Sequence, residues 1–184
     1  MKRHIFWTPW EGPGLEHAQV IQNEAGVGVR SVLIGLKDDS PFEVQYQLFC
    51  DTTWATREVS LQTFDQKGIS LKADGAGHWT TGAGIAIDSL EGCIDVDITA
   101  SPLTNTLPIR RLGLLEAGQS AEIAVAWINA PTLTLNAVRQ RYTCLGTGRY
   151  RYEGLGTGFQ AEITVDEDGL VIDYPGVFRR TWAR

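Results

Sequence analysis

The chain has 184 residues, a length typical of one domain, and we expect a single β-barrel-like domain over residues 1–184. Its net charge of −6 at pH 7 excludes the basic face that general nucleic-acid binding requires, so we expect no nucleic-acid partner. No apolar run approaches the ~20 residues that span a bilayer, which argues against stable insertion into a membrane.

Three cysteines, Cys50, Cys93 and Cys144, form an odd and widely spaced set that fits neither a disulfide framework nor a zinc motif. Reduced thiols in a cytosolic protein are the plain interpretation of such a set. The first residues, Met-Lys-Arg-His-Ile-Phe-Trp, lack the apolar segment and the cleavage site of a signal peptide. We therefore expect a cytoplasmic protein.

A period of two in hydrophobicity predicts strands along most of the chain. In chain order, the predicted strands lie in residues 28–36, 42–50, 54–61, the first part of 93–111, 123–127, 133–144 and 159–165. Residues 28–36 are apolar on both faces, which predicts a strand covered on both sides. For residues 133–144 a helix is an alternative, but we favour two strand pieces whose parity shifts at a bulge.

Glycine and proline are frequent, with 20 and 7 residues respectively, and no amphipathic helix of ten or more residues is evident. The acidic run 166–168 precedes Gly169, which predicts a solvated hairpin tip. We therefore predict an all-β fold, in which one strongly bent antiparallel sheet forms a barrel or a half-barrel. Closure or coverage of this kind protects the edges of many short strands.

Arg57 stands out within its predicted strand because it shares a face with Ala55, Val59 and Leu61. An arginine on an apolar face must find a carboxylate, backbone carbonyls or a polar group of a ligand. A structural ion pair is one interpretation. The other is an arginine that faces a cavity and holds a phosphate, a carboxylate or a sugar hydroxyl.

Residues 93–111 combine strand, turn and charge more densely than any other segment. Asp95 and Asp97 lie two apart on one strand and therefore share a face, while Arg110 and Arg111 follow a corner bracketed by Pro102 and Pro108. Pairing of the aspartates with Arg110, Arg111 or Arg57 would make the segment a charged clasp that holds the bend of the sheet. A pair of carboxylates acting as acid and nucleophile is the catalytic alternative.

Other chemical motifs are weak. No Gly-x-Ser-x-Gly sequence is present, and the glycine-rich segment 154–158 is followed by a strand rather than by a lysine and a helix. The three histidines, His4, His17 and His78, lack the spacing of metal ligands. We therefore expect no cofactor, no metal and no catalytic set that can be named from the sequence.

Four segments resemble the bacterial family labelled putative glycolipid-binding. These are Cys50-Asp51-x-x-Trp54-x-Thr56-Arg57, Gly92-Cys93-x-Asp95-Val96-Asp97, Thr104-Asn105-Thr106-Leu107-Pro108-Ile109-Arg110-Arg111-Leu112 and Asp168-Gly169-Leu170-Val171-x-Asp173-Tyr174-Pro175-Gly176. The resemblance implies a single antiparallel β domain, comparable with the periplasmic lipoprotein carriers, and the binding of a lipid or glycolipid. It implies no residue-level activity. This chain has Ser101-Pro102-Leu103 where many members have Thr-Pro-Phe.

Our leading hypothesis is a binding protein whose concave sheet face holds an amphipathic small molecule. The residues expected to fix its polar head are Arg57, Asp95, Asp97, Asn105, Arg110 and Arg111, and those expected to wall its apolar part are Tyr46, Trp54, Trp127 and Tyr174. The hypothesis requires an interior pocket of ligand size, roughly 300 Å³ or more.

Two alternatives from other functional classes stay open. One is a hydrolase or isomerase that uses Asp95 or Asp97 as its acid or base, which requires a carboxylate of raised pKa beside an open cleft. The other is a structural or partner-binding β protein that forms a homodimer through an exposed edge or apolar patch.

Overall fold

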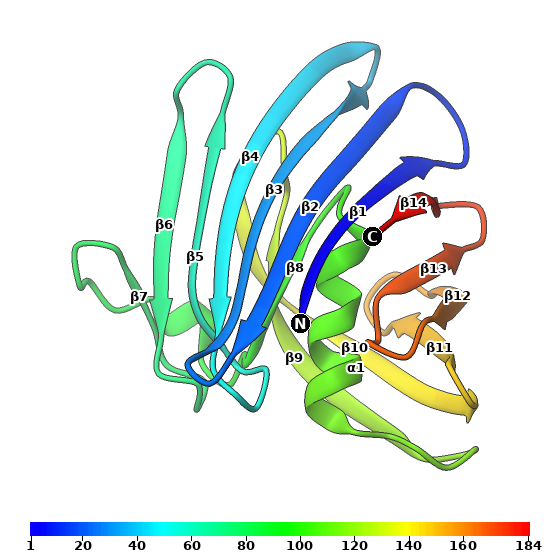
Figure 1. Ribbon diagram of the computed structural model, residues 1–184. Helices are drawn as coiled ribbons and strands as arrows, with labels where there is room; N and C mark the ends of the chain where they lie inside the picture. The colour runs from blue at the N-terminus through cyan, green and yellow to red at the C-terminus, as the bar shows by residue number, and fades with distance from the viewer.

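A computed structural model describes residues 1–184 and confirms the predicted all-β class (Figure 1). The strands are β1 (Lys2–Pro9), β2 (Gly14–Asn23), β3 (Gly26–Lys37), β4 (Ser40–Cys50), β5 (Thr56–Thr63), β6 (Gly68–Ala73), β7 (Trp79–Thr81), β8 (Asp95–Ile98), β9 (Ser120–Ile128), β10 (Leu135–Gly146), β11 (Arg149–Gly154), β12 (Phe159–Val165), β13 (Val171–Tyr174) and β14 (Phe178–Ala183). The helical elements are the 3-10 turns η1 (Asp88–Leu90) and η2 (Pro102–Asn105) and the helix α1 (Thr106–Leu112).

All fourteen strands belong to one sheet in the order β7-β6-β5-β4-β3-β2-β1-β14-β13-β12-β11-β10-β9-β8. The sheet therefore consists of two meanders, β1–β7 and β9–β14, joined where the first and last strands pair. Pairing is antiparallel except between β8 and β9. The sheet curls strongly without closing, and Figure 1 shows α1 lying between these two meanders, which form the two arms of the sheet. This is the half-barrel of the prediction.

Alternation of side chains divides the sheet into an inner and an outer face. In β4, Val44, Tyr46 and Leu48 are buried inside, and the residues between them are exposed. The prediction that residues 28–36 are covered on both sides is wrong, because Ile34 of β3 is 46% exposed on the outer face. Apolar residues on an outer face are common enough that a continuous apolar run does not establish two-sided coverage.

The segment 133–144 is a strand, as favoured, but it contains no bulge against its first neighbour. Residues 135–143 of β10 pair with β9 without interruption. The irregularity lies at the other edge of β10, between Cys144 and Gly146.

The predicted corner between Pro102 and Pro108 is instead a helical segment, η2–α1, that fills the inner face of the sheet (Figure 1). Leu103 and Leu107 belong to the larger apolar core, and Ile109 belongs to a smaller core on the β9–β14 side. Pro108 lies in the first turn of α1, where its missing N–H leaves no bond unmade. None of the helices has the length and apolar character needed to cross a membrane.

A buried carboxylate anchors the start of η2–α1, which we call the inner segment. Glu16 of β2 accepts hydrogen bonds from the hydroxyls of Ser31 (2.8 Å), Tyr46 (2.7 Å) and Ser101 (2.9 Å). Ala100, just before Ser101, has a φ of +67°, a left-handed conformation that turns the chain out of β8. Burial raises the pKa of Glu16 to about 7 from its ordinary value of 4.5, although the three hydroxyls oppose the shift.

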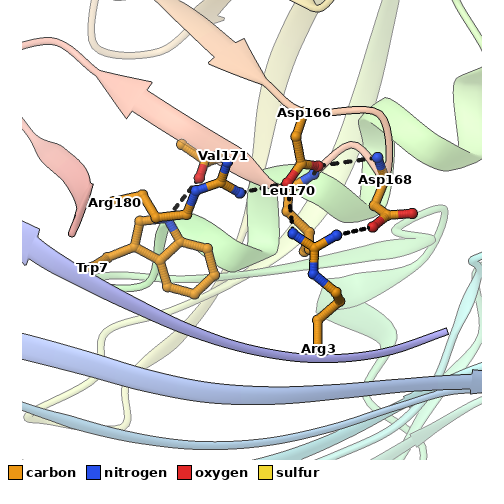
Figure 2. A network of polar contacts seen from close by, with 7 residues as sticks. All are labelled: Arg3, Trp7, Asp166, Asp168, Leu170, Val171 and Arg180. Carbon is orange, nitrogen blue, oxygen red and sulfur yellow. Dashed lines mark hydrogen bonds and ion pairs between the residues drawn. The ribbon is translucent and has the colours of Figure 1, made fainter. Parts of the chain in front are cut away.

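A second polar network joins the two arms of the sheet (Figure 2). Asp166, in the turn after β12, pairs with Arg180 of β14 at 2.5 Å and with Arg3 of β1 at 3.4 Å. Its other oxygen accepts the backbone N–H groups of Asp168 and Leu170, both at 3.0 Å. Asp166 is therefore not part of a solvated hairpin tip, because its side chain is only 13% exposed.

This network reinforces a part of the sheet with little backbone pairing. Strand β13 has four residues and pairs with β14 through two residue pairs, Asp173 with Arg179 and Tyr174 with Phe178. Nearby, the buried Trp7 of β1 donates its indole N–H to the carbonyl of Val171 at 2.8 Å. Side chains of β1 and β14 thus hold the short strand in place.

We expect Asp166→Ala to lower the free energy of unfolding by about 2–4 kcal/mol, because it removes the carboxylate partner of Arg180, one of the two carboxylate partners of Arg3, and the acceptor of two backbone N–H groups. Urea denaturation at pH 7 measures the change. Glu162→Ala is the matched control, because its ion pair with Arg149 is more than half exposed and contributes little. Equal effects of the two variants would contradict the assigned role of Asp166.

The anchor at Glu16 predicts a pH dependence of stability that Glu16→Gln abolishes. Below pH 4.5 the Glu16 carboxyl is protonated in both the folded and the unfolded chain, so its ionisation does not reduce the free energy of unfolding. Between pH 4.5 and 7 the unfolded chain loses this proton first, so the stability of the wild type falls by about 3 kcal/mol and stays lower above pH 7. The glutamine variant lacks this contribution.

Unfolding of wild type and Glu16→Gln by urea, at a series of pH values from 4 to 8, tests this expectation. The difference in unfolding free energy between the two proteins, wild type minus variant, should decrease as the pH rises. A difference that is independent of pH would show that Glu16 does not titrate with the assigned pKa.

Candidate functional site

The candidate site is a small cleft on the inner face, where β8 passes into η2. Its volume is about 120 Å³. The lining residues come from β8, the following turn, η2 and four strands of the second meander: Asp97, Ile98, Thr99, Ala100, Ser101, Pro102, Asn105, Trp127, Tyr152, Tyr174 and Phe178. The cleft is thus the space that the inner segment leaves open beside β9–β14.

Asp97 is the charged group of the cleft. Its carboxylate accepts hydrogen bonds from the amide of Gln140 at 2.6 Å and from the hydroxyl of Thr104 at 3.3 Å. No arginine, lysine or histidine pairs with it. Burial raises the pKa of Asp97 above its usual range, and the two hydrogen bonds only partly offset this effect.

Two tyrosines beside Asp97 present hydroxyl groups that make no hydrogen bond within the protein. Tyr174 is only 7% exposed, and its ring contacts that of Tyr152 at a centroid distance of 6.1 Å. Burial and the nearby Asp97 carboxylate raise the pKa of both phenols, so both remain protonated donors at neutral pH. Neither hydroxyl is a buried group without a partner, so both are accessible, unpaired donors that a ligand can reach.

Apolar rings extend the cleft toward solvent. Phe159 lies 6.1 Å from Tyr152 and 6.3 Å from Tyr174, and it is 45% exposed. Phe178 lines the cleft from β14. The site therefore combines one carboxylate and two hydroxyl donors with aromatic faces.

Asn105 is held in place by a hydrogen bond from the buried Tyr142. The Tyr142 hydroxyl donates to the Asn105 side-chain oxygen at 2.9 Å, and the Asn105 amide donates to the carbonyl of Pro102 at 3.3 Å. Tyr142 thereby links β10 to the inner segment and fixes one wall of the cleft.

Four of the residues predicted to bind a ligand meet at this cleft: Asp97, Asn105, Trp127 and Tyr174. The cleft is smaller than the expected volume of roughly 300 Å³, because Leu103 and the rest of η2–α1 fill much of the concave face. A larger open hollow of about 540 Å³ lies beside the end of α1, and the predicted residue Arg110 lines it. The Asp97 cleft therefore has room for part of an amphipathic molecule and not for the whole of one.

Most of the other predicted residues make contacts within the fold. Asp95 is fully buried and receives three hydrogen bonds from Arg111, two from Nε at 2.9 and 3.2 Å and one from Nη2 at 2.6 Å. This pair confirms the clasp for Asp95, while Asp97 has no arginine partner. The guanidinium of Arg110 lies 5.2 Å from the ring centroid of Trp54. Tyr46, as described above, serves the Glu16 anchor.

The placement of Arg57 on an apolar face is wrong because a β-bulge changes the register there. Phe49 pairs with Glu58 and Cys50 pairs with Thr56, which leaves Arg57 as the extra residue. Thr56 takes the buried position, and the Arg57 side chain is 39% exposed. It bonds to the carbonyl of Asp74 and lies 3.6 Å from the carboxylate of Asp51.

Sequence reasoning missed Glu16 and several cleft residues. Glu16 carried the signal that was applied to Arg57, since it shares a strand face with the apolar Ala18 and Val20. Tyr152 and Gln140 carried no such signal. Their strands are distant from Asp97 in the sequence, and only the sheet register brings the three together.

The cleft provides one carboxylate rather than a pair. Asp95 is committed to Arg111, so the two aspartates do not supply the acid and nucleophile of a two-carboxylate hydrolase. No group of three histidine, cysteine or acidic side chains is arranged to hold a metal ion. The geometry is best suited to hydrogen bonding with a hydroxylated molecule whose apolar part lies against aromatic rings.

The chain was compared with known proteins. A family model described as "Putative glycolipid-binding" matches residues 4–180. The crystal structure of a DUF1089 family protein from Pseudomonas aeruginosa is 41% identical, has a TM-score of 0.82, and is matched over 93% of this chain and 95% of that chain. At 41% identity the Pseudomonas protein is a relative of this chain and not the same protein. No curated protein matches the chain. The chain belongs to the putative glycolipid-binding family.

Proposed function

We propose that this protein binds the hydroxylated head group of an amphipathic, glycolipid-like molecule in the cleft around Asp97. One observation carries the proposal: the Asp97 carboxylate lies beside two tyrosine hydroxyls, of Tyr152 and Tyr174, that have no partner in the protein. A sugar hydroxyl can donate to the carboxylate and accept from a phenol at the same time. The description of the family supports the same class of ligand.

The size of the cleft determines how such a ligand would lie. With about 120 Å³ available, the head group enters and the acyl chain stays outside the filled interior. Phe159, which is 45% exposed, and Phe178, at the cleft itself, offer an apolar path from the cleft to the surface. The proposed mode is therefore recognition of the head, with partial cover for the tail.

An enzymatic role is the second candidate, because Asp97 combines a raised pKa with a position at an open cleft. Asp97 alone suits a single proton transfer, as in an isomerase, better than a two-carboxylate hydrolysis. We favour binding because no second carboxylate and no histidine, lysine or cysteine lines the cleft.

The compartment and the oligomeric state belong to the same proposal. Cys50, Cys93 and Cys144 are all buried with free thiols, which supports a reducing, cytoplasmic compartment.

Ile34 and Phe64, exposed on the first arm, supply an apolar surface for a homodimer. Light scattering during size-exclusion chromatography distinguishes a dimer from a monomer.

Binding of n-octyl β-glucoside below its critical micelle concentration tests the proposed site, with calorimetry as the measurement. Tyr174→Phe should weaken binding by about three- to tenfold through loss of one hydrogen bond. Asp97→Asn should weaken it by about tenfold or more, because a charged acceptor is lost. An octyl ether without the sugar should bind weakly to the wild type and to both variants.

Tyr150→Phe is the matched control, because the Tyr150 hydroxyl donates to the carbonyl of Leu114 and lies outside the cleft. Thermal unfolding of each variant verifies that the fold is intact. Wild-type affinity in both Tyr174→Phe and Asp97→Asn would overturn the proposal, as would equal affinity for the glucoside and for the ether.

A further inference from the structure

A second hollow lies on the outer face of the sheet, over strands β1–β6, on the opposite side from the Asp97 cleft. Its volume is about 630 Å³, within the range of small-molecule sites. Side chains that line it from the outer face are His4, His17, Gln19, Arg30, Val32, Gln45, Gln47, Ser60, Gln62 and Ser70. Amide and hydroxyl groups dominate this lining.

The centre of the hollow is a single row of polar residues that crosses six strands. Each residue pairs directly with the next across neighbouring strands, in the order His4, Gln19, Arg30, Gln47, Ser60 and Ser70. At a strand spacing of about 4.8 Å, the row extends over roughly 24 Å. We name these six residues the outer polar row.

Four members of the outer polar row have unused hydrogen-bonding capacity. The side chains of Arg30, Gln47, Ser60 and Ser70 make no hydrogen bond or ion pair within the protein. Only the end of the row is paired, where the Gln19 amide lies 3.0 Å from a ring nitrogen of His4. Consecutive free donors and acceptors on neighbouring strands can contact an extended ligand at regular intervals.

Small residues give the hollow its depth. Ser60, Ser70 and Gly68 lie on β5 and β6, next to the long side chains of Gln45 and Gln62. The outer face is therefore lower at one end of the row and bordered by amide groups. A flat polar surface made only for solubility would not require this contour.

The charge of the hollow is unusual for a protein with a net charge of −6. Its lining contains no aspartate or glutamate, and Arg30 lies at its centre without a counter-ion. The acidic side chains nearest in the sheet, Glu43 and Glu58, lie outside this lining. Charge complementarity thus favours an anionic ligand at Arg30.

We infer that the outer polar row is a second binding site, and that it takes an anionic oligosaccharide. The carboxylate or phosphate of the sugar pairs with the Arg30 guanidinium, and ring hydroxyls exchange hydrogen bonds with Gln47, Ser60 and Ser70. The site uses a different face and different strands from the Asp97 cleft, so it does not depend on the head-group proposal.

Nuclear magnetic resonance of the ¹⁵N-labelled full chain tests this site, with 3′-sialyllactose as an anionic oligosaccharide probe. Saturable shifts should appear at the side-chain amides of Gln19 and Gln47 and at the backbone of the outer polar row. The methyl ester of the same sugar, which lacks the negative charge, should bind about tenfold more weakly.

Arg30→Ala should weaken binding of sialyllactose by about tenfold and remove the preference over the methyl ester. Arg151→Ala is the matched control, because Arg151 is an exposed arginine of β11 without an ion-pair partner and lies outside the hollow. Asp97→Asn should leave this binding unchanged, which separates failure of this site from failure of the inner cleft.

The source of the sugar is resolved with phosphatidylcholine vesicles that carry the ganglioside with the same trisaccharide head group. Binding to the free sugar, or Arg30-dependent sedimentation with the vesicles alone, supports the site and assigns a free or a lipid-linked ligand respectively. Binding to neither form would overturn the proposal. Shifts centred on the Asp97 cleft, or equal losses in Arg30→Ala and Arg151→Ala, would overturn it as well.

Discussion

A single buried carboxylate, Glu16, determines what occupies the inside of this curled sheet. Burying a carboxylate is costly, and hydrogen bonds to Glu16 from Ser31 and Tyr46 of the sheet and Ser101 of the inner segment reduce this cost without removing it. Because Ser101 is the residue from which η2 begins, satisfying Glu16 also positions Leu103 in the core. The half-barrel is therefore filled by its own chain, and the Asp97 cleft is the space that this filling leaves.

The different surroundings of Asp95 and Asp97 show how the inner segment separates structural from functional chemistry. Arg111, near the end of α1, reaches Asp95 and neutralises it. Asp97, two residues after Asp95, receives a hydrogen bond only from the hydroxyl of Thr104 in the inner segment and from the amide of Gln140 in β10. The first carboxylate is used to hold the segment. The second has no arginine partner and lies at the edge of a cleft, where its oxygens can accept further hydrogen bonds.

The all-β class was predictable because alternation has a period of two in most strands, whereas local irregularities were not. Arg57 and Glu16 make this contrast clear, since each is a charged residue in an apolar register. The pattern held for Glu16, and a bulge of one residue moved Arg57 out of the core. Residues 102–112 form a helical segment because Leu103, Leu107 and Ile109 pack against two apolar cores. This tertiary packing could not be predicted from a short sequence with two prolines and several polar residues. Of the cleft, Asp97, Asn105, Trp127 and Tyr174 were predicted, whereas Tyr152 was not.

The outer polar row illustrates a kind of site that no sequence motif can reveal. Its members lie on six strands, each at least ten residues from the next, and they become neighbours only through sheet register. Outer residues contribute nothing to the core, so solubility alone would allow any polar side chain at these positions, acidic ones included. In a chain with an excess of acidic residues, a hollow without any of them and with an unpaired Arg30 at its centre departs from that expectation. The shape of the surface differs as well as its composition, because the small residues Ser60, Ser70 and Gly68 deepen the hollow where the unpaired hydrogen-bonding groups lie. That coincidence distinguishes a binding surface from a merely solvated one.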